Sequence, residues 1–156
     1  MRIHMIAVGH KPPPWVDQAY RTYARRLSGE CSLHLEEVPA GKRNKGVPVA
    51  RLCAEEGDRI LRRVPRGAVV VALDEGGQQW SSQQLADQLA AWLLGGRDLC
   101  LLIGGADGLA PACLERAHSI WSLSRLTLPH ALVRIVLAEQ LYRAWSMYKN
   151  HPYHRD

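Results

Sequence analysis

The sequence predicts a single α/β domain, residues 1–156, in which helices flank a mostly parallel β-sheet. Short apolar runs of strand length alternate along the chain with longer segments in which apolar residues recur at helical spacing. Two of the runs, residues 68–73 and 99–103, are apolar throughout, which is typical of strands buried on both faces of a parallel sheet. With 156 residues and 47% apolar composition, the chain suits one domain with a substantial core.

The first half of the chain is expected to form two strand–helix units. An apolar run over residues 2–9 ends at a glycine and predicts the first strand. After three consecutive prolines, apolar residues recur at helical spacing over residues 16–27, which predicts a helix. Alternation over residues 31–35 predicts a half-buried strand. A basic loop bounded by glycines, residues 39–46, then leads into a second helix that ends near Val64.

The middle of the chain adds two buried strands and one helix. The strand at residues 68–73 is followed by a segment, residues 74–79, that we expect to be a variable loop whose acidic pair is solvated. Ser82 is a candidate N-cap for a helix that carries apolar residues as far as Leu93. The second buried strand, residues 99–103, runs directly into a glycine-rich turn.

The last quarter of the chain predicts one more strand between two helices. Pro111 suits the first turn of a short helix. Residues 119–123 predict the last strand, and residues 124–129 a loop. Apolar residues over residues 130–148 predict a long helix, and their spread over more than a narrow stripe is compatible with a buried dimer face.

Composition narrows the class of protein. The formal net charge of +5 favours an anionic partner such as nucleic acid, although many proteins carry a small positive charge without such a role. The four cysteines form no C-x-x-C pair, which argues against zinc-ribbon and thioredoxin-like proteins. With no signal peptide and no long apolar span, we expect a reduced, cytoplasmic protein without a membrane segment.

Three loops are candidates for a ligand site, because ligands of parallel α/β sheets bind beyond the carboxyl ends of the strands. They follow Leu73, Ile103 and Leu123. The loop after Ile103 has the sequence GGADG, which lets the backbone approach a ligand closely. It lacks the Lys and Ser or Thr of a phosphate loop and the full Rossmann spacing, and a purely structural turn remains the alternative. The chain also lacks the G-x-S-x-G elbow of serine hydrolases.

Two further segments have unusual composition. Residues 122–130 combine apolar residues with small hydroxyls and have no acidic residue, as an adenine pocket would, although an ordinary strand end is the alternative. The tail, residues 150–156, holds His151, Tyr153, His154 and Arg155. Because no carboxylate or thiol lies nearby to complete a ligand set, we expect no metal there. An RNA-facing or catalytic tail fits better, since Tyr and His stack on bases and Arg binds phosphate.

Six stretches spread from end to end of the chain carry a family resemblance. They are VPAGKR at 38–43, LIGG at 102–105, WSLS at 121–124, LTLPH at 126–130, LYRAW at 141–145 and NHPYHR at 150–155. In this combination the chain resembles the RlmH-type ribosomal large-subunit pseudouridine N3-methyltransferases of the SPOUT superfamily. The resemblance implies a deep trefoil knot in the C-terminal part, which folding rules alone would not suggest. It also implies a homodimer.

The same resemblance implies a cofactor, S-adenosylmethionine, and the residues that contact it. Carried over position by position, the contacts fall on Leu73, Gly104, Leu123, Ser124, Arg125, Leu126, Thr127 and Leu128. These positions lie on the three strand-end loops identified above. At Arg125 we expect the backbone, and not the side chain, to make the contact.

The implied reaction is methylation of N3 of a pseudouridine in 23S ribosomal RNA. Its main requirement is alignment of nucleophile, methyl group and sulfur. We expect His154 to accept the N3 proton and Tyr153 to stack on or orient the base. Arg143 and Arg155 are candidates to hold phosphate or the negative charge that develops on the uracil oxygens.

The resemblance finally implies that the RNA is met in the assembled ribosome, because the chain has no separate RNA-binding domain. Lys42, Arg43 and Lys45 of the basic loop are candidates for phosphate contacts, and a solvated surface loop is the alternative. Two other functions stay open. One is a non-catalytic RNA-binding or ribosome-assembly factor, and the other is a nucleotide-dependent enzyme, which would be expected to carry a phosphate-binding fingerprint.

Overall fold

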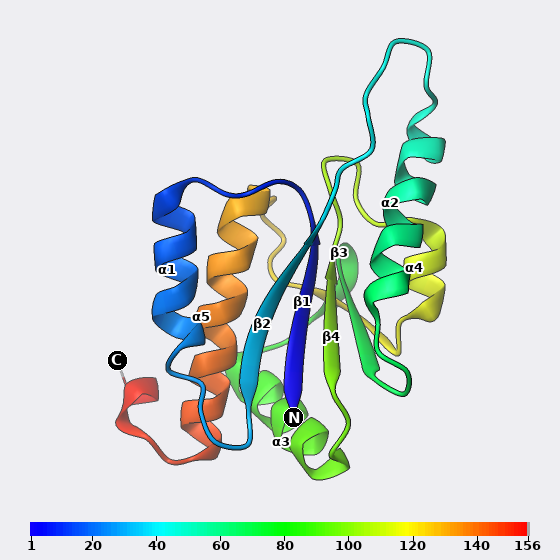
Figure 1. Ribbon diagram of the computed structural model, residues 1–156. Coiled ribbons are helices and arrows are strands. Elements are labelled where there is room, and N and C mark those ends of the chain that lie inside the picture. The colour runs from blue at the N-terminus through cyan, green and yellow to red at the C-terminus, as the bar shows by residue number, and fades with distance from the viewer. Residues whose placement is uncertain (156) are drawn as a thin grey trace.

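The computed structural model describes residues 1–155, in which strands and helices alternate (Figure 1). The elements are β1 Arg2–Val8, α1 Pro14–Ala24, β2 Ser32–Val38, α2 Val49–Arg63, β3 Val69–Gln79, α3 Ser82–Gly95, β4 Leu99–Ile103, α4 Pro111–Arg116, β5 Ser119–Ser122, α5 His130–Tyr148 and a 3₁₀ turn, η1, Pro152–Arg155. Every strand and helix expected from the sequence is present, and the α/β class is confirmed.

The strands form one sheet in the order β2-β1-β4-β3-β5, and every pair in it is parallel. Helices α1, α3 and α5 cover one face, and α2 and α4 cover the other (Figure 1). The sequence of strand β4 is continuously apolar because the strand is buried on both faces of the sheet. Leu99 and Leu101 pack into the core under the first group of helices, whereas Cys100 and Leu102 pack under the second. The predicted parallel sheet, buried on both faces, is confirmed.

Strand β3 corrects one prediction. It continues to Gln79 instead of ending at Leu73, so residues 74–79 are not a variable loop. Both Leu73 and Gln78 pair with Trp121 of β5, which marks a β-bulge between them. A Cβ atom at Gly77 would lie 2.7 Å from the backbone of Ile120, so only glycine fits at this crossing.

The start of α3 corrects a second prediction by one position. Ser81, and not Ser82, is the N-cap. Its hydroxyl accepts a hydrogen bond from the backbone N–H of Gln84 at 3.1 Å, and the side chain of Gln84 accepts one from the N–H of Ser81 at 2.8 Å. This is a complete capping box, in which the two residues satisfy each other's free backbone donors.

Helix α5 occupies the predicted residues and packs against both α1 and α3. These contacts account for most of its apolar surface within one protomer. Leu132, near its start, keeps 37% of its surface exposed, and Tyr148, at its end, 40%. The homodimer and the trefoil knot stay predictions. Within residues 1–155 no helix is both long and apolar enough to cross a membrane.

Candidate functional site

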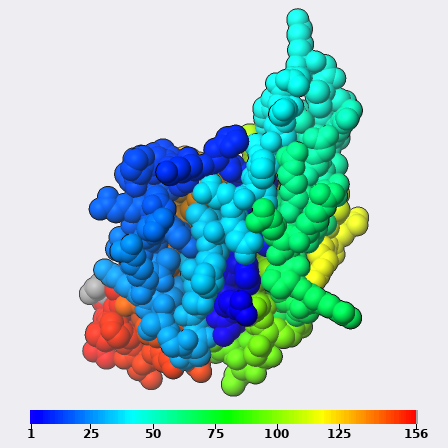
Figure 2. Space-filling model, viewed as in Figure 1, coloured from blue at the N-terminus to red at the C-terminus, as the bar shows by residue number. Residues whose placement is uncertain are grey.

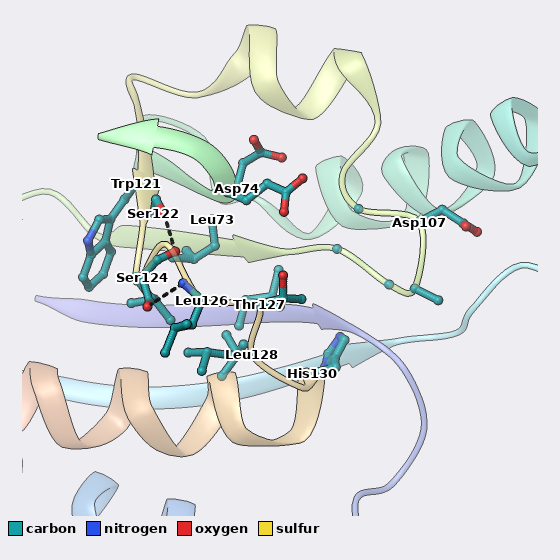
Figure 3. A pocket seen from close by; sticks show the side chains of 18 residues that line it. Leu73, Asp74, Asp107, Trp121, Ser122, Ser124, Leu126, Thr127, Leu128 and His130 are labelled. Atoms are coloured by element: carbon teal, nitrogen blue, oxygen red, sulfur yellow. Dashed lines mark hydrogen bonds between the residues drawn. The ribbon is translucent and has the colours of Figure 1, made fainter. Parts of the chain in front are cut away.

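A pocket of about 580 Å³ opens at the carboxyl ends of β4 and β5 and beside the bulged part of β3 (Figure 3). Three segments far apart in the sequence form its walls: residues 73–75, residues 103–108 and residues 121–128, with Arg125 left out. His130 and Val133 of α5 complete the lining. The three segments identified from the strand pattern therefore meet around one cavity, although the one after Leu73 is the bulged part of β3 and not a loop. The size of the cavity suits a small-molecule ligand.

The structure brings together most of the residues that the resemblance assigns to the cofactor. Those that line the pocket are Leu73, Gly104, Leu123, Ser124, Leu126, Thr127 and Leu128. Arg125 is exposed, and its side chain is not part of the lining. That placement agrees with the expectation that its side chain makes no contact with the ligand, and the contacts themselves stay predictions.

The glycine-rich loop folds tightly on itself at the floor of the pocket. Gly105 and Gly108 form an isolated β-bridge. A Cβ atom at Gly104 would clash with the backbone of Gly108, so a side chain there would force the loop open. The glycine at this position is therefore required by the shape of the pocket, as well as by any approach of a ligand.

The loop after β5 is held by its own serines. The Ser122 hydroxyl donates a hydrogen bond to the carbonyl of Ser124 at 3.1 Å, and the Ser124 hydroxyl accepts one from the N–H of Leu126 at 2.9 Å (Figure 3). Neighbouring backbone groups and the side chains of Leu123 and Leu128 face the cavity. Apolar walls beside ordered backbone donors and acceptors can bind a flat heterocycle such as adenine.

The pocket is acidic. Asp74, Glu75 and Asp107 line it, and the lining contains no Lys or Arg. Asp74 accepts a hydrogen bond from the N–H of Gly76 at 2.9 Å, and Asp107 forms an ion pair with Arg43 of the basic loop. Such a lining favours a cationic ligand and disfavours a phosphate. The sequence-based interpretation of the acidic pair as merely solvated missed this placement, which depends on the bulge in β3.

At the start of α5, a titratable side chain, His130, faces the pocket. Burial lowers its pKa, and the positive charge of Arg134, one turn further along the helix, lowers it again. Arg134 is itself buried and forms an ion pair with Glu37 at 3.3 Å. A neutral imidazole therefore adds no positive charge to the pocket at neutral pH.

The candidate catalytic residues Arg143 and Tyr153 come together at the other end of α5. Both bind the carboxylate of Glu139. Nε of Arg143 donates a hydrogen bond to Oε1 of Glu139 at 3.0 Å, and Nη2 of Arg143 lies 2.8 Å from the same oxygen. The Tyr153 hydroxyl also donates to this oxygen, at 3.0 Å. The guanidinium also lies 5.1 Å from the centre of the Tyr153 ring. Sequence reasoning missed Glu139, although its position four residues before Arg143 was a usable signal.

The environment of the tail sets its protonation and its exposed groups. Burial, and then the hydrogen bond to Glu139, raise the pKa of Tyr153 to about 12, so this phenol stays protonated at neutral pH. His154 lies in η1, half-buried, and its Nδ1 atom is buried without a hydrogen-bond partner among residues 1–155. The same residues contain no cluster of three or more His, Cys, Asp or Glu placed to hold a metal ion.

The structure does not bring the pocket and the tail together within one chain. Val133 is the last residue of α5 that lines the pocket, and Arg143 lies ten residues further along the helix, which corresponds to about 15 Å at the rise of an α-helix. Figure 1 shows the pocket loops at one end of α5 and the C-terminus at the other.

Comparison with known proteins gives a consistent result. A family model described as "Predicted SPOUT methyltransferase" matches residues 1–154. A protein of Thioalkalivibrio sulfidiphilus named "Ribosomal RNA large subunit methyltransferase H" is 54% identical over 156 residues, with all of both chains covered. A protein of the same name from Methylococcus capsulatus is 52% identical over 155 residues, which cover 99% of this chain and 100% of that protein.

Solved structures agree at the level of the fold. A probable methyltransferase from Bordetella pertussis has a TM-score of 0.56 at 19% identity, covering 92% of this chain and 95% of that one. A probable methylase family protein from Haemophilus influenzae has a TM-score of 0.55 at 16% identity, covering 97% and 69%. At such low identity these similarities concern the arrangement of strands and helices alone.

Proposed function

The chain belongs to the SPOUT methyltransferase family, and on that premise we propose that it transfers a methyl group from S-adenosylmethionine to N3 of a pseudouridine in large-subunit ribosomal RNA. The observation that carries the proposal is one pocket in which three segments meet, residues 73–75 of β3 and the loops after β4 and β5. The N3 position and the pseudouridine rest on the sequence motifs that the chain shares with the RlmH-type enzymes.

The residues of the pocket fit this cofactor. S-adenosylmethionine, when bound, supplies a methyl group on a positively charged sulfur. The backbone and leucines of residues 123–128 offer a slot for its adenine ring, and Asp74 and Glu75 offer negative charge to its sulfonium and ammonium groups. ATP and NAD fit poorly, because their phosphates would face carboxylates without a single Lys or Arg in the lining.

Ribosomal RNA as substrate is supported by two features. Both close relatives carry the words "Ribosomal RNA large subunit" in their names. The net charge of +5 also favours a polyanionic partner. Because so small a chain has little surface for reading an RNA by itself, we expect the assembled large subunit to present the target nucleotide.

The tail residues have separate roles in this proposal. His154 accepts the proton that leaves N3. Tyr153 stays protonated and orients the base by stacking and by its hydroxyl. Arg143 and Arg155 oppose the negative charge that develops on the uracil oxygens. The substitution His154→Ala is therefore expected to abolish turnover and to leave the affinity for S-adenosylmethionine nearly unchanged.

A homodimer is part of this proposal, and the distance between pocket and tail supports it. About 15 Å of helix separates them in one chain, so in the proposed dimer the tail of a second copy reaches the pocket. Trp15 at the start of α1 is 56% exposed and Leu132 near the start of α5 is 37% exposed, and the two helices pack together. Large apolar side chains are therefore available for a partner at this end of the molecule.

The first test is calorimetric titration with S-adenosylmethionine, with ATP and NAD as controls. We expect saturable binding of S-adenosylmethionine alone. Transfer of a labelled methyl group to large ribosomal subunits, followed by mass spectrometry of the nucleosides, then identifies the target. If the dimer neither bound S-adenosylmethionine nor transferred a methyl group, a non-catalytic RNA-binding factor would be favoured. Binding of ATP or NAD would instead favour a nucleotide-dependent enzyme.

A further inference from the structure

The positive charge of this protein is concentrated in one segment. Residues 42–66 contain eight of the 20 Lys and Arg residues and three of the 15 Asp and Glu residues. This segment, which we call the basic ridge, therefore has a net charge of +5, equal to that of the entire chain. All other residues together are neutral. A charge so localised is a property of one surface and is not spread over the molecule.

The basic ridge also stands out in shape. It comprises most of the loop before α2, α2 itself and the turn that follows, on the face of the sheet covered by α2 and α4. Figures 1 and 2 show the loop and the start of α2 rising beyond the rest of the molecule. The ridge can therefore reach a partner that the body of the domain does not touch.

Several cations of the ridge are available to a partner. Lys42, Lys45, Arg62 and Arg66 are exposed, and none of them forms an ion pair or side-chain hydrogen bond with residues 1–155. The other four are engaged within the fold. Arg51 pairs with Glu55, Arg63 with Glu36 and Arg43 with Asp107, and Arg59 donates a hydrogen bond to the carbonyl of Pro39. Half of the cations of the ridge are therefore free to bind a partner.

The ridge is fixed to the pocket by two contacts. Arg43 forms the ion pair with Asp107, which lines the pocket. Glu56, only 5% exposed, accepts a hydrogen bond from the N–H of Gly41 at 3.0 Å. The other oxygen of Glu56 would lie 3.1 Å from a Cβ atom at Gly105, so the same side chain touches both the basic loop and the glycine-rich loop. The position of the ridge relative to the pocket is thereby set.

We propose that the basic ridge binds the phosphodiester backbone of RNA that flanks the target nucleotide, and so fixes the register of the substrate on the pocket. This proposal rests on the proposed function for the identity of the substrate. Helix α2 alone has 15 residues and a length of about 22 Å, so its far cations cannot all contact one nucleotide. Lysine and arginine side chains without internal partners are the groups that neutralise phosphates.

The test compares neutralised arginines on and off the ridge. Arg62→Gln and Arg66→Gln, alone and combined, are matched with Arg25→Gln, which removes an exposed arginine at the end of α1. Binding to purified large ribosomal subunits is measured between about 50 and 200 mM KCl at constant magnesium. Methyl transfer and the affinity for S-adenosylmethionine are measured in parallel.

The double variant is expected to bind large subunits several-fold more weakly, with a slope of log affinity against log salt that is shallower by about 1 to 2. Its KM for the subunits should rise while its kcat and its affinity for S-adenosylmethionine stay at the wild-type values, and Arg25→Gln should behave as wild type. Wild-type affinity and slope in the double variant would overturn the proposal, even if the ridge were then found to bind an acidic protein. A wild-type protein that methylates no RNA, yet binds subunits through the ridge, would instead overturn the proposed function alone.

Discussion

Among single residues, Glu139 is the one on which the order of the candidate catalytic tail depends most. It accepts hydrogen bonds from Arg143 and from Tyr153 and is itself only 17% exposed. The substitution Glu139→Gln keeps the shape and removes the charge. Charge-assisted hydrogen bonds of this kind contribute about 1.5–3 kcal/mol, so we expect kcat to fall by about tenfold or more. Calorimetry should show unchanged affinity for S-adenosylmethionine, because Glu139 is not part of the pocket lining.

The same variant has a spectroscopic signature. The carboxylate of Glu139 opposes ionisation of Tyr153, so its removal should lower the pKa of that phenol from about 12, although burial, the larger cause, remains. Ultraviolet titration of the tyrosines at alkaline pH measures the change. Asp87→Asn, which removes an exposed carboxylate that accepts a hydrogen bond from Gln83 on α3, is the matched control and should leave activity and titration unchanged. Wild-type kcat in Glu139→Gln would exclude a positioning role.

The acidic lining of the pocket predicts a preference for substrate over product. S-adenosylmethionine loses its sulfonium charge when the methyl group leaves, so nearby carboxylates stabilise it more than S-adenosylhomocysteine. Glu75→Gln should reduce the ratio of the two affinities by about two- to fivefold, a modest effect because this carboxylate is exposed to solvent. Competition calorimetry with both ligands measures the ratio. The control is Glu115→Gln, on α4 and outside the pocket, which should leave the ratio of the two affinities unchanged. If Glu75→Gln weakened both ligands equally, the carboxylate would not discriminate between them by charge.

At the scale of elements, the sequence predicted what local patterns determine and missed what distant pairing determines. Apolar runs and helical spacing were enough to find every strand and helix. The extension of β3 beyond Leu73 was missed because Gly76 and Gly77 resemble a turn locally. Their strand conformation depends on β5, which lies about forty residues further along the chain and pairs across the bulge. The cap of α3 was misplaced by one position because Ser81 and Ser82 are adjacent, and only the capping box distinguishes them.

The crossing of β3 and β5 yields a prediction about stability. Gly77→Ala would bring a methyl group to within 2.7 Å of the backbone of Ile120, so β5 must shift. We expect a loss of about 1–3 kcal/mol in the free energy of unfolding, measured by denaturant unfolding. Affinity for S-adenosylmethionine should fall as well, because β5 leads directly into the pocket loop.

The control for Gly77→Ala uses another glycine of the same chain. Gly95 lies at the end of α3, and a Cβ atom there would meet no other atom within 4 Å. Gly95→Ala should therefore be neutral or slightly stabilising, as alanine in a helix generally is relative to glycine. A similar loss of stability in both variants would contradict the steric explanation.

At the scale of the whole molecule, the pocket could be predicted and the relation of the tail to it could not. The rule that ligands bind at the carboxyl ends of parallel strands led to all three pocket segments, although the one after Leu73 is the bulged continuation of β3 and not a loop. The tail is different, because its residues are recognisable only as unusual composition and its position depends on packing against α5. Nothing local in the sequence indicates that η1 docks beside Glu139, about 9 Å along the helix from Val133 at the edge of the pocket.

This separation leads to a test of the homodimer by complementation. Gly104→Ala should disrupt the pocket and leave the tail intact, whereas His154→Ala should inactivate the tail and leave the pocket intact. If the tail of one protomer serves the pocket of its partner, each mixed dimer contains one site with both parts intact. Random exchange of the two inactive variants should then restore up to about a quarter of the wild-type activity.

If pocket and tail acted within one chain, no mixed dimer would have an intact site, and the mixture would stay inactive. Mixing His154→Ala with Arg143→Ala is the matched control, since both variants carry the defect in the tail, and it should restore nothing in either arrangement. Sedimentation of each protein alone and after exchange shows that dimers have formed, and co-purification of the untagged variant with an affinity-tagged one shows that they are mixed. An inactive mixture of such mixed dimers would exclude a site shared between protomers.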